Sequence, residues 1–392
     1  MNLKLSFQLS ALPFHCQSHG FALHADAGSL TLSVRYDYDP RPLTLSAPIK
    51  KGDLCEILLL DHRIALSVNG TLADEEWPAG RCLAEPQALS RCLHTEPYVA
   101  PATPPAVLGT FENAEGWRPE ENVFVGDCMP YTRDGEYHVL YLKDRHHHHS
   151  KWGLGAHQWE HISTRDFKTW QIHPTAVPIT DPNEGSICTG SWIREGEVEY
   201  LFYTVRRGTG IPAPIRRSVS RNGYHFEKDP AFGFCLSEKY RTASARDPKV
   251  FKGADGRFHM LLTTALNAIQ KGCLAHLISK DLTHWEEADE PLLITADGGS
   301  PECPDYFFYN GYYYLVYSLE GKARYALSRH PFEGFSEPEN PVIPCGWVPK
   351  AAPWRGQLIF TGFEQLENYA GTMTFTAATA DEKGILRFHK LP

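Results

Sequence analysis

The sequence lacks the features by which several classes of protein are identified. No run approaches the roughly 18 apolar residues that a membrane-spanning helix requires. The formal net charge is -9, so the chain has no excess of the basic residues that nucleic acid or an anionic membrane surface attracts. Its 10 cysteines include no CxxC pair and no metal-ligand spacing, which removes the common zinc and thiol-redox motifs. We therefore expect neither nucleic acid nor a membrane as a partner.

The N-terminal residues 1–16, MNLKLSFQLSALPFHC, also lack the continuous apolar core of a signal peptide. Ser6, Gln8 and Ser10 interrupt the apolar stretch, so we interpret it as a first β-strand. Cysteines in a chain without an export signal are expected to be reduced, and this predicts a cytoplasmic location.

Long helical periodicity is absent as well, and at 392 residues the chain is long enough for two domains. The clearest boundary is the proline-rich stretch PYVAPATPP at 97–105, because proline can continue neither a helix nor a central strand. We place a linker at residues 97–110, a first domain at 1–96 and a second at 111–392.

The first domain is predicted to be a small accessory β-sandwich. Alternating apolar runs at 30–38 and 55–70 indicate short strands. Asn69-Gly70 predicts a type I′ turn, since both central residues of that turn need positive φ. Nothing in this segment resembles a catalytic motif.

The second domain contains two short elements that recur in the same order. The first is a turn glycine followed by an aromatic-rich strand. The second is a small polar residue, a basic residue, often Asp or Asn, and then an aromatic. A repeat of about 45–60 residues matches one four-stranded blade, so five copies predict a five-bladed β-propeller. The first element occurs at Gly135, Gly196, Gly256, Gly311 and, more weakly, Gly356, and the second at 164–170, 220–226, 279–285 and 328–335.

Three acidic residues, Asp127, Asp247 and Glu302, each lie beside an apolar or aromatic strand of this repeat. In a propeller the inner strands converge on one axis, so side chains far apart in sequence can share a pocket. Paired carboxylates are what cleavage of a glycosidic bond requires, because one attacks or orients water while the other protonates the leaving oxygen. Each acid could instead be a turn-forming residue beside a proline, a reading that is weakest for Glu302.

Several motifs of the second domain resemble glycoside hydrolase family 32, the β-fructosidases that include invertases, inulinases and levanases. Segment 126–130, GDCMP, corresponds to the family's Asn-Asp-Pro-Asn-Gly nucleophile motif. Arg246-Asp247-Pro248 matches the Arg-Asp-Pro motif, and Glu302-Cys303-Pro304 matches the Glu-Cys motif. Further similarity covers HVLYL, WGLGAHQWEH and CTGS (138–142, 152–161 and 188–191), and the whole resemblance runs from about residue 120 to 365.

The resemblance implies an all-β catalytic propeller that hydrolyses a β-fructofuranoside with retention and needs no metal or organic cofactor. Asp127 would be the nucleophile, and Glu302 would be first acid and then base. Asp247 would hold two ring hydroxyls, with Arg246 orienting it. Retention predicts about 5–5.5 Å between the attacking and donating carboxyl groups. The further candidates for substrate contact are Trp152 as a stacking wall, together with Ser191 and Cys303.

The departures from the family fall at the site itself. Gly126 stands where the family has Asn, Cys128 and Met129 replace Pro and Asn, and Leu142 replaces Gln. Losing a buried hydrogen-bond partner costs on the order of 1–3 kcal/mol, so the preferred fructoside is expected to differ from plain sucrose or inulin. The chain also has its predicted sandwich before the propeller, whereas the family commonly has it after.

Four consecutive histidines, His146 to His149, follow Arg145. Adjacent residues on an extended segment point to opposite sides, so at most two could share a metal ion. We favour a loop at the pocket rim, where Arg145 and His147 contact the leaving group or a phosphorylated sugar.

Two alternatives stay open. One is an enzyme that acts on another furanoside, such as an arabinofuranoside, by hydrolysis or transfer. The other is a carbohydrate-binding propeller without activity. The oligomeric state cannot be read from the sequence.

Overall fold

The computed structural model describes residues 2–38, 40–78, 80–145, 157–182, 184, 186–207, 210–296 and 298–391. The chain divides into two compact units. Of the described residues, the first unit holds those within Met1–Thr103 and Ile179–Ser186, and the second holds the remainder from Pro104 onward. In the described residues no helix is long and apolar enough to cross a membrane. All 10 cysteines lie within the described residues, and none of them forms a disulfide bond.

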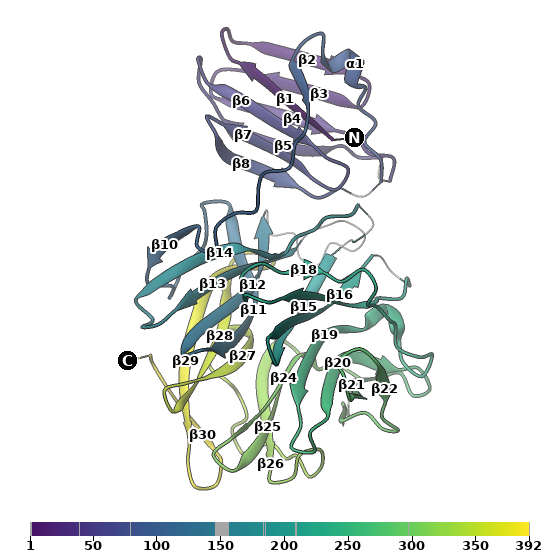
Figure 1. Ribbon diagram of the computed structural model, residues 1–392, viewed down its shortest axis with the longest axis vertical. Helices are drawn as coiled ribbons and strands as arrows, with labels where there is room; N and C mark the ends of the chain where they lie inside the picture. The colour runs from purple at the N-terminus through teal and green to yellow at the C-terminus, as the bar shows by residue number, and fades with distance from the viewer. Residues whose placement is uncertain are drawn as a thin grey trace. The chain divides into compact units, whose positions relative to one another are not determined.

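The first unit consists of two antiparallel sheets (Figure 1). One has the order β8-β7-β6-β1-β9 and the other β2-β3-β4-β5. Alternate residues of both sheets, such as Leu5 and Leu32, are fully buried in a single apolar core. The strands are β1 (Leu3–Gln8), β2 (Phe14–Ser18), β3 (Phe21–Ala25), β4 (Ser29–Val34), β5 (Leu43–Pro48), β6 (Leu54–Leu59), β7 (Ile64–Val68), β8 (Thr71–Glu76) and β9 (His94–Pro97), with one short helix, α1 (Pro86–Leu89).

Two details of this unit bear on the sequence predictions. The segment predicted as a single first strand contains β1 and the start of β2. Asn69 and Gly70, with φ of 51° and 80°, connect β7 to β8, which confirms the tight turn predicted there. The treatment of residues 1–96 as an independent accessory domain remains our proposal.

The second unit is a β-propeller of five antiparallel blades (Figure 1). Each blade is built on a meander that runs outward from its innermost strand, and in the first blade the preceding strand β10 adds to the outer edge by pairing with β14. A pairing of Val125 with Gly371 links the first blade to the fifth. The blades are β10 to β14 (Gly109–Glu112, Val123–Arg133, Glu136–Arg145, Gln158–Thr164, Thr169–Val177); β15 to β18 (Ser186–Glu195, Val198–Arg206, Ile215–Ser220, Glu227–Lys228); β19 to β23 (Arg246–Lys252, Phe258–Leu266, Lys271–Ser279, Trp285–Glu287, Leu293–Ile294); β24 to β26 (Glu302–Tyr309, Tyr312–Leu319, Lys322–Ser328); and β27 to β30 (Trp347–Trp354, Gln357–Gln365, Gly371–Ala380, Leu386–His389).

Each of the two repeated sequence elements is one turn of a blade. The glycine element closes the hairpin between the first and second strands, where Asp134 and Gly135 have φ of 51° and 76°. The second element joins the third strand to the outer strand. In the first blade Asp166 Oδ1 accepts hydrogen bonds from the backbone of Lys168 and Thr169 at 2.8 and 2.9 Å. Asn222 and Asp281 make the equivalent bonds in the next two blades. Short polar side chains that bond to nearby backbone in this way favour a turn, which explains the recurring pattern.

A buried histidine pair in the third blade predicts that stability depends on pH. Burial lowers the pKa of His276 to about 4, and it also lowers the pKa of His259. In the unfolded chain each imidazole titrates near 6.5, so below that pH the unfolded state binds more protons and the native state loses stability. For His276 we expect a loss of about 1.4 kcal/mol per pH unit as the pH falls from 6.5 toward 4, and His259 adds a loss of the same sign. Chemical denaturation across this range measures the slope.

The matched comparison is between His276→Gln and His330→Gln, since His330 is exposed. His276→Gln should make the stability less dependent on pH, whereas His330→Gln should leave the slope unchanged. Equal slopes in both variants would contradict the assignment.

Candidate active site

The candidate site lies where the innermost strands of several blades contain a β-bulge. In β11, β19, β24 and β27 the register with the next strand shifts near the start of the strand. Three residues in these β-bulges, Asp247, Cys303 and Val348, have positive φ, between 40° and 58°. A bulge turns side chains out of the regular alternation. Asp127 and Asp247 lie inside two of the bulges and Glu302 borders a third, so all three acids leave their ladders at the same end of a strand.

Asp127 is held by side chains from three other blades. Its Oδ1 accepts a hydrogen bond of 2.8 Å from the Tyr369 hydroxyl, which precedes β29. Its Oδ2 accepts a short hydrogen bond from Thr189 on β15 and a 3.3 Å contact from the Cys303 thiol on β24. All three groups donate, so the carboxylate is oriented from both sides as an acceptor. A nucleophile needs this kind of fixed direction.

Gly126 makes room for one of these partners. A Cβ at this position would lie 2.5 Å from the Tyr369 hydroxyl oxygen, which is too close for any side chain without movement of the tyrosine. The Tyr369 hydroxyl also accepts a 3.2 Å hydrogen bond from the Asp127 backbone N–H. The glycine beside the candidate nucleophile and the tyrosine from the fifth blade therefore form one arrangement.

The other two acids are joined through Arg246 and Cys303. Arg246 Nη2 donates to Glu302 Oε1 at 2.6 Å, and its Nε lies 3.6 Å from Asp247 Oδ2. That same Asp247 oxygen accepts a 3.1 Å hydrogen bond from the Cys303 backbone N–H. Cys303 thus contacts Asp127 through sulfur and Asp247 through its backbone, so these contacts connect all three carboxylates.

Burial sets the protonation of several of these groups. It raises the pKa of the Asp247 carboxyl; Arg246 opposes that rise and the charge of Asp127 adds to it. Burial, together with the negative charge of Asp127, also raises the pKa of the Cys303 thiol and of the Tyr369 hydroxyl well above their ordinary values. Both therefore keep their protons and act as hydrogen-bond donors to Asp127 at neutral pH.

A buried lysine lies on the inner side of the site. Lys350, on β27, donates a 3.0 Å hydrogen bond to the Gly190 carbonyl of β15, so it connects two innermost strands. Burial lowers the pKa of its amine, while Cys303 and Asp305 oppose that shift. Asp305 in turn is paired with Lys249 at 2.6 Å. The charges behind the three acids are thus compensated within the propeller.

Comparison with known proteins identifies the family. The family described as "Glycosyl hydrolases family 32 N-terminal domain" matches residues 119–334, which is more than half of the chain. The chain belongs to glycosyl hydrolase family 32. The resemblance predicted from the motifs is therefore confirmed.

Individual relatives match over part of their length. The sucrose-6-phosphate hydrolase of Escherichia coli is 30% identical over 225 residues, 54% of this chain and 44% of that protein. The chain therefore spans less than half the length of this relative. Among solved structures, fructan 1-exohydrolase IIa from Cichorium intybus superimposes with a TM-score of 0.58 at 18% identity, covering 71% of this chain and 60% of that one. A GH43 β-xylosidase/α-arabinofuranosidase from a compost metagenome gives a TM-score of 0.53 at 14% identity, covering 71% and 98%. At these identities the structural matches show the fold alone.

The structure places the residues predicted for this family 32 site in different surroundings. Asp127, Asp247, Glu302, Arg246 and Cys303 are brought together, as described above. Ser191 is buried below them, where its hydroxyl donates to the Pro248 carbonyl and accepts from the Val250 N–H, both at 2.8 Å. These contacts connect β15 to β19, and they give the hydroxyl a structural role.

Arg145 is fully buried at the end of β12. Its guanidinium donates to Asn122 at 2.7 Å and lies 3.6 Å from Glu120, so it is not an exposed rim residue. The predicted contacts of Trp152 and His147 concern positions outside the described residues, as does the rest of the histidine run. Their roles stay predictions.

Two residues that contact the candidate nucleophile Asp127, Thr189 and Tyr369, are not among those predicted from the sequence. Thr189 lies in the CTGS motif at 188–191, which is part of the resemblance to the family. The motif contains two hydroxyl residues, and the sequence analysis predicts substrate contact for the other one, Ser191. Tyr369 follows the last matched motif and has no local signal, because its proximity to Asp127 arises only when the fifth blade closes against the first.

Tyr369→Phe is predicted to impair catalysis without unfolding the chain. Removing a hydrogen bond to a charged group costs about 1.5–3 kcal/mol, so we expect kcat/KM to fall roughly 10- to 150-fold on the preferred substrate.

Tyr309→Phe is the control, since the Tyr309 hydroxyl donates to the Gly356 carbonyl at 2.9 Å and contacts none of the three acids. If both variants keep full activity, Tyr369 does not position the candidate nucleophile.

Proposed function

We propose that the protein is a retaining glycoside hydrolase that cleaves a β-fructofuranoside through a covalent fructosyl-enzyme. The observation that carries the proposal is the contact set around Asp127, where donors from three other blades fix one carboxylate beside Asp247 and the Arg246–Glu302 pair. Nucleophilic displacement at an anomeric carbon requires one oriented carboxylate that attacks and a second acid nearby that protonates the leaving group.

Each residue takes one part in the two-step reaction. Asp127 attacks the anomeric carbon while Glu302 gives its proton to the leaving oxygen. Glu302 then accepts a proton from water as that water releases the sugar from Asp127, which restores both acids. Asp247 accepts hydrogen bonds from the ring hydroxyls. Its buried negative charge stabilises the positive charge that develops on the sugar.

Arg246 has two functions in this scheme. It holds the half-exposed Glu302 side chain through the 2.6 Å contact, and it keeps a positive charge near Asp247. Substrate binding places the leaving oxygen beside Glu302, where this carboxyl must be able to exchange a proton. The side chain of Glu302 is 50% exposed, so solvent reaches it in the free enzyme and can supply that proton.

The preference for a fructoside over another furanoside is supported by the family assignment and the ordered Asp, Arg-Asp-Pro and Glu-Cys motifs. The fold by itself does not distinguish them, because the GH43 structure matches it as well. A relative named as a sucrose-6-phosphate hydrolase makes the phosphorylated disaccharide a candidate substrate alongside sucrose and fructooligosaccharides. We propose a carbohydrate as the partner and no cofactor. The cytoplasmic location remains a prediction.

The test is product release from a panel that contains sucrose, sucrose 6-phosphate, inulin and levan oligosaccharides, difructose anhydrides and aryl arabinofuranosides. Release of fructose or its phosphate by the wild type, with none from an Asp127→Asn/Glu302→Gln double variant, supports the proposal. Release of the arabinose alone would overturn the choice of sugar. No release from any member would favour the binding propeller.

A further inference from the structure

Three histidines of the first blade meet away from the candidate active site. His138, His161 and His173 lie on the adjacent strands β12, β13 and β14, and each is at most 1% exposed. One ring nitrogen from each lies within 4.8 Å of the others. Three imidazoles buried close together need an explanation, because each ring has two polar nitrogens and a buried polar nitrogen normally has a hydrogen-bond partner or another ligand.

The hydrogen bonds of His173 identify its free lone pair. Nδ1 lies 2.7 Å from the Ala106 carbonyl, so it carries the proton, and in the neutral ring Nε2 is then an acceptor. Nε2 lies 2.7 Å from the Ser163 hydroxyl, which is also 2.6 Å from Glu136 Oε1. Ser163 has one proton for these two acceptors, so within this network one acceptor is always left without it.

The other two rings also leave nitrogens unsatisfied. His138 Nδ1 and His161 Nε2 lie 3.0 Å apart, and the Tyr131 hydroxyl is 3.1 Å from the same His161 nitrogen. The opposite nitrogens, His138 Nε2 and His161 Nδ1, are buried and have no hydrogen-bond partner among the described residues. Exchanging the tautomers moves the deficiency between rings but does not remove it.

The third blade contains a histidine pair at equivalent positions, and comparison with it shows which features are found only in the first blade. His259 Nδ1 lies 2.9 Å from His276 Nε2, on the equivalent second and third strands. There, however, His259 Nε2 meets the hairpin residue Asp255 at 3.1 Å, and Phe332 packs on both rings. This pair is complete without a further ligand.

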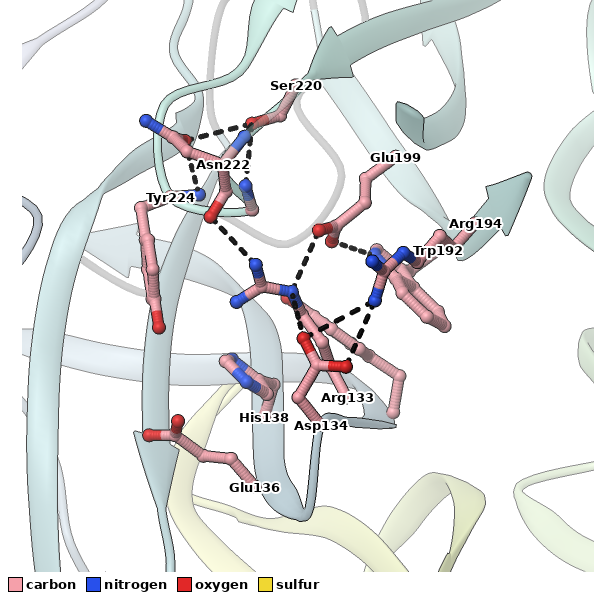
Figure 2. Close-up of polar contacts among 12 residues, drawn as sticks. Arg133, Asp134, Glu136, His138, Trp192, Arg194, Glu199, Ser220, Asn222 and Tyr224 are labelled. Atoms are coloured by element: carbon pink, nitrogen blue, oxygen red, sulfur yellow. Dashed lines mark hydrogen bonds and ion pairs between the residues drawn. The ribbon is translucent and has the colours of Figure 1, made fainter. Parts of the chain in front are cut away.

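In the first blade the equivalent hairpin acid is turned away. Asp134 stands four residues before His138, as Asp255 does before His259, but it pairs with Arg133 and Arg194 (Figure 2). Arg133 is also held by Glu199 at 2.8 Å, so its charge is compensated near the histidines. His138 therefore lacks the acid that completes the other pair, and a third histidine is present instead.

We propose that His138, His161 and His173 bind a Zn²⁺ ion in the first blade, with the fourth position open to water or the Tyr131 oxygen. Imidazole suits zinc, and three histidines with one open position form a known class of zinc coordination. The 3.0 Å between His138 and His161 nitrogens is near the roughly 3.3 Å edge of a tetrahedron with Zn–N of about 2.0 Å. The Ala106 carbonyl then orients His173, as outer partners of zinc histidines commonly do.

The hydrogen bonds around Ser163 support a zinc ion on His173. A zinc ion on His173 Nε2 leaves the Ser163 proton to Glu136, which resolves the competition between them. The site ties three strands together and contacts none of the three acids, so its role is structural and independent of the proposed hydrolase activity.

The experiment measures zinc bound to the full chain in which His146–His149 are replaced by serine, because that run could bind zinc by itself. Zinc is loaded, excess is removed, and the content is measured by elemental mass spectrometry. Cobalt loading gives a second readout, since tetrahedral Co²⁺ absorbs strongly in the visible range. His173→Gln is compared with His276→Gln, which alters the matched pair of the third blade. Circular dichroism confirms that each variant is folded.

We expect about one zinc per chain, a visible cobalt spectrum, and loss of both in His173→Gln but not in His276→Gln. Zinc should also raise the Tm of the parent chain and not that of His173→Gln. Less than about 0.1 zinc per chain in the folded parent, or equal zinc in both variants, would overturn the proposal. If His173→Gln does not fold, absence of the cobalt spectrum in the parent overturns it, and its presence with loss in His161→Gln supports it.

Discussion

Asp127→Asn should lower kcat/KM by about 10⁴-fold or more on every substrate that the wild type cleaves. The amide keeps the shape of the side chain but cannot form the ester with the sugar, so the first step of the reaction is lost. The three donors around Asp127 sharpen the expectation. Tyr369, Thr189 and Cys303 all donate to it, and an amide nitrogen would meet one of them as a second donor. Both chemistry and orientation therefore fail together.

The covalent intermediate provides the direct measurement. Wild-type enzyme quenched by acid during turnover should yield a peptide containing Asp127 that carries the mass of one fructosyl group. The variant should yield none. Asp134→Asn, an exposed hairpin position of the same blade, is the control and should retain activity. Substantial turnover by Asp127→Asn, or an adduct on another acid, would show that the nucleophile is misassigned.

Glu302→Gln should show a loss that depends on the leaving group. General acid catalysis contributes about 10²–10⁴-fold, so we expect a loss of this size on a fructooligosaccharide, whose leaving alkoxide needs a proton. On an aryl fructoside with an acidic phenol, the first step needs little protonation. The loss there should be far smaller for that step, and the fructosyl-enzyme should accumulate because the base for water is missing.

Burst kinetics on the aryl substrate separate these two steps. The variant should release a rapid burst of phenol followed by slow turnover, and added azide should speed the second phase by attacking without a base. Glu286→Gln, an exposed residue on β22, is the comparison. Equal losses on both substrates, with no burst, would mean that Glu302 does not act as the acid and base.

The propeller could be recognised from the sequence because each blade repeats two local turns. A glycine with positive φ closes a hairpin wherever it occurs, and an Asp166-type side chain bonds to backbone two and three residues ahead. These are short-range interactions, so they leave the same residue pattern in each copy. Counting the copies was enough to predict the blades.

The three acids were likewise visible because each lies in a short motif. Asp247 follows Arg246, and Cys303 follows Glu302, so the residues that bring charge and bulge geometry together are adjacent in the chain. The CTGS motif does not show which of its two hydroxyl residues, Thr189 or Ser191, faces the site. Both occur in one motif, and only the direction of β15 decides which hydroxyl faces Asp127 and which faces the neighbouring strand.

The sequence by itself thus determined the family and the repeated blades, and it predicted the three candidate acids, because these features depend on residues close together in the chain. Tertiary structure alone decided that Tyr369 contacts Asp127 and that Lys350 connects β27 to β15. It also decided that His173 meets the histidine pair of its own blade. These contacts join side chains from different blades or strands. Their geometry depends on the β-bulges and on the closure of the propeller, and no local sequence pattern contains that information.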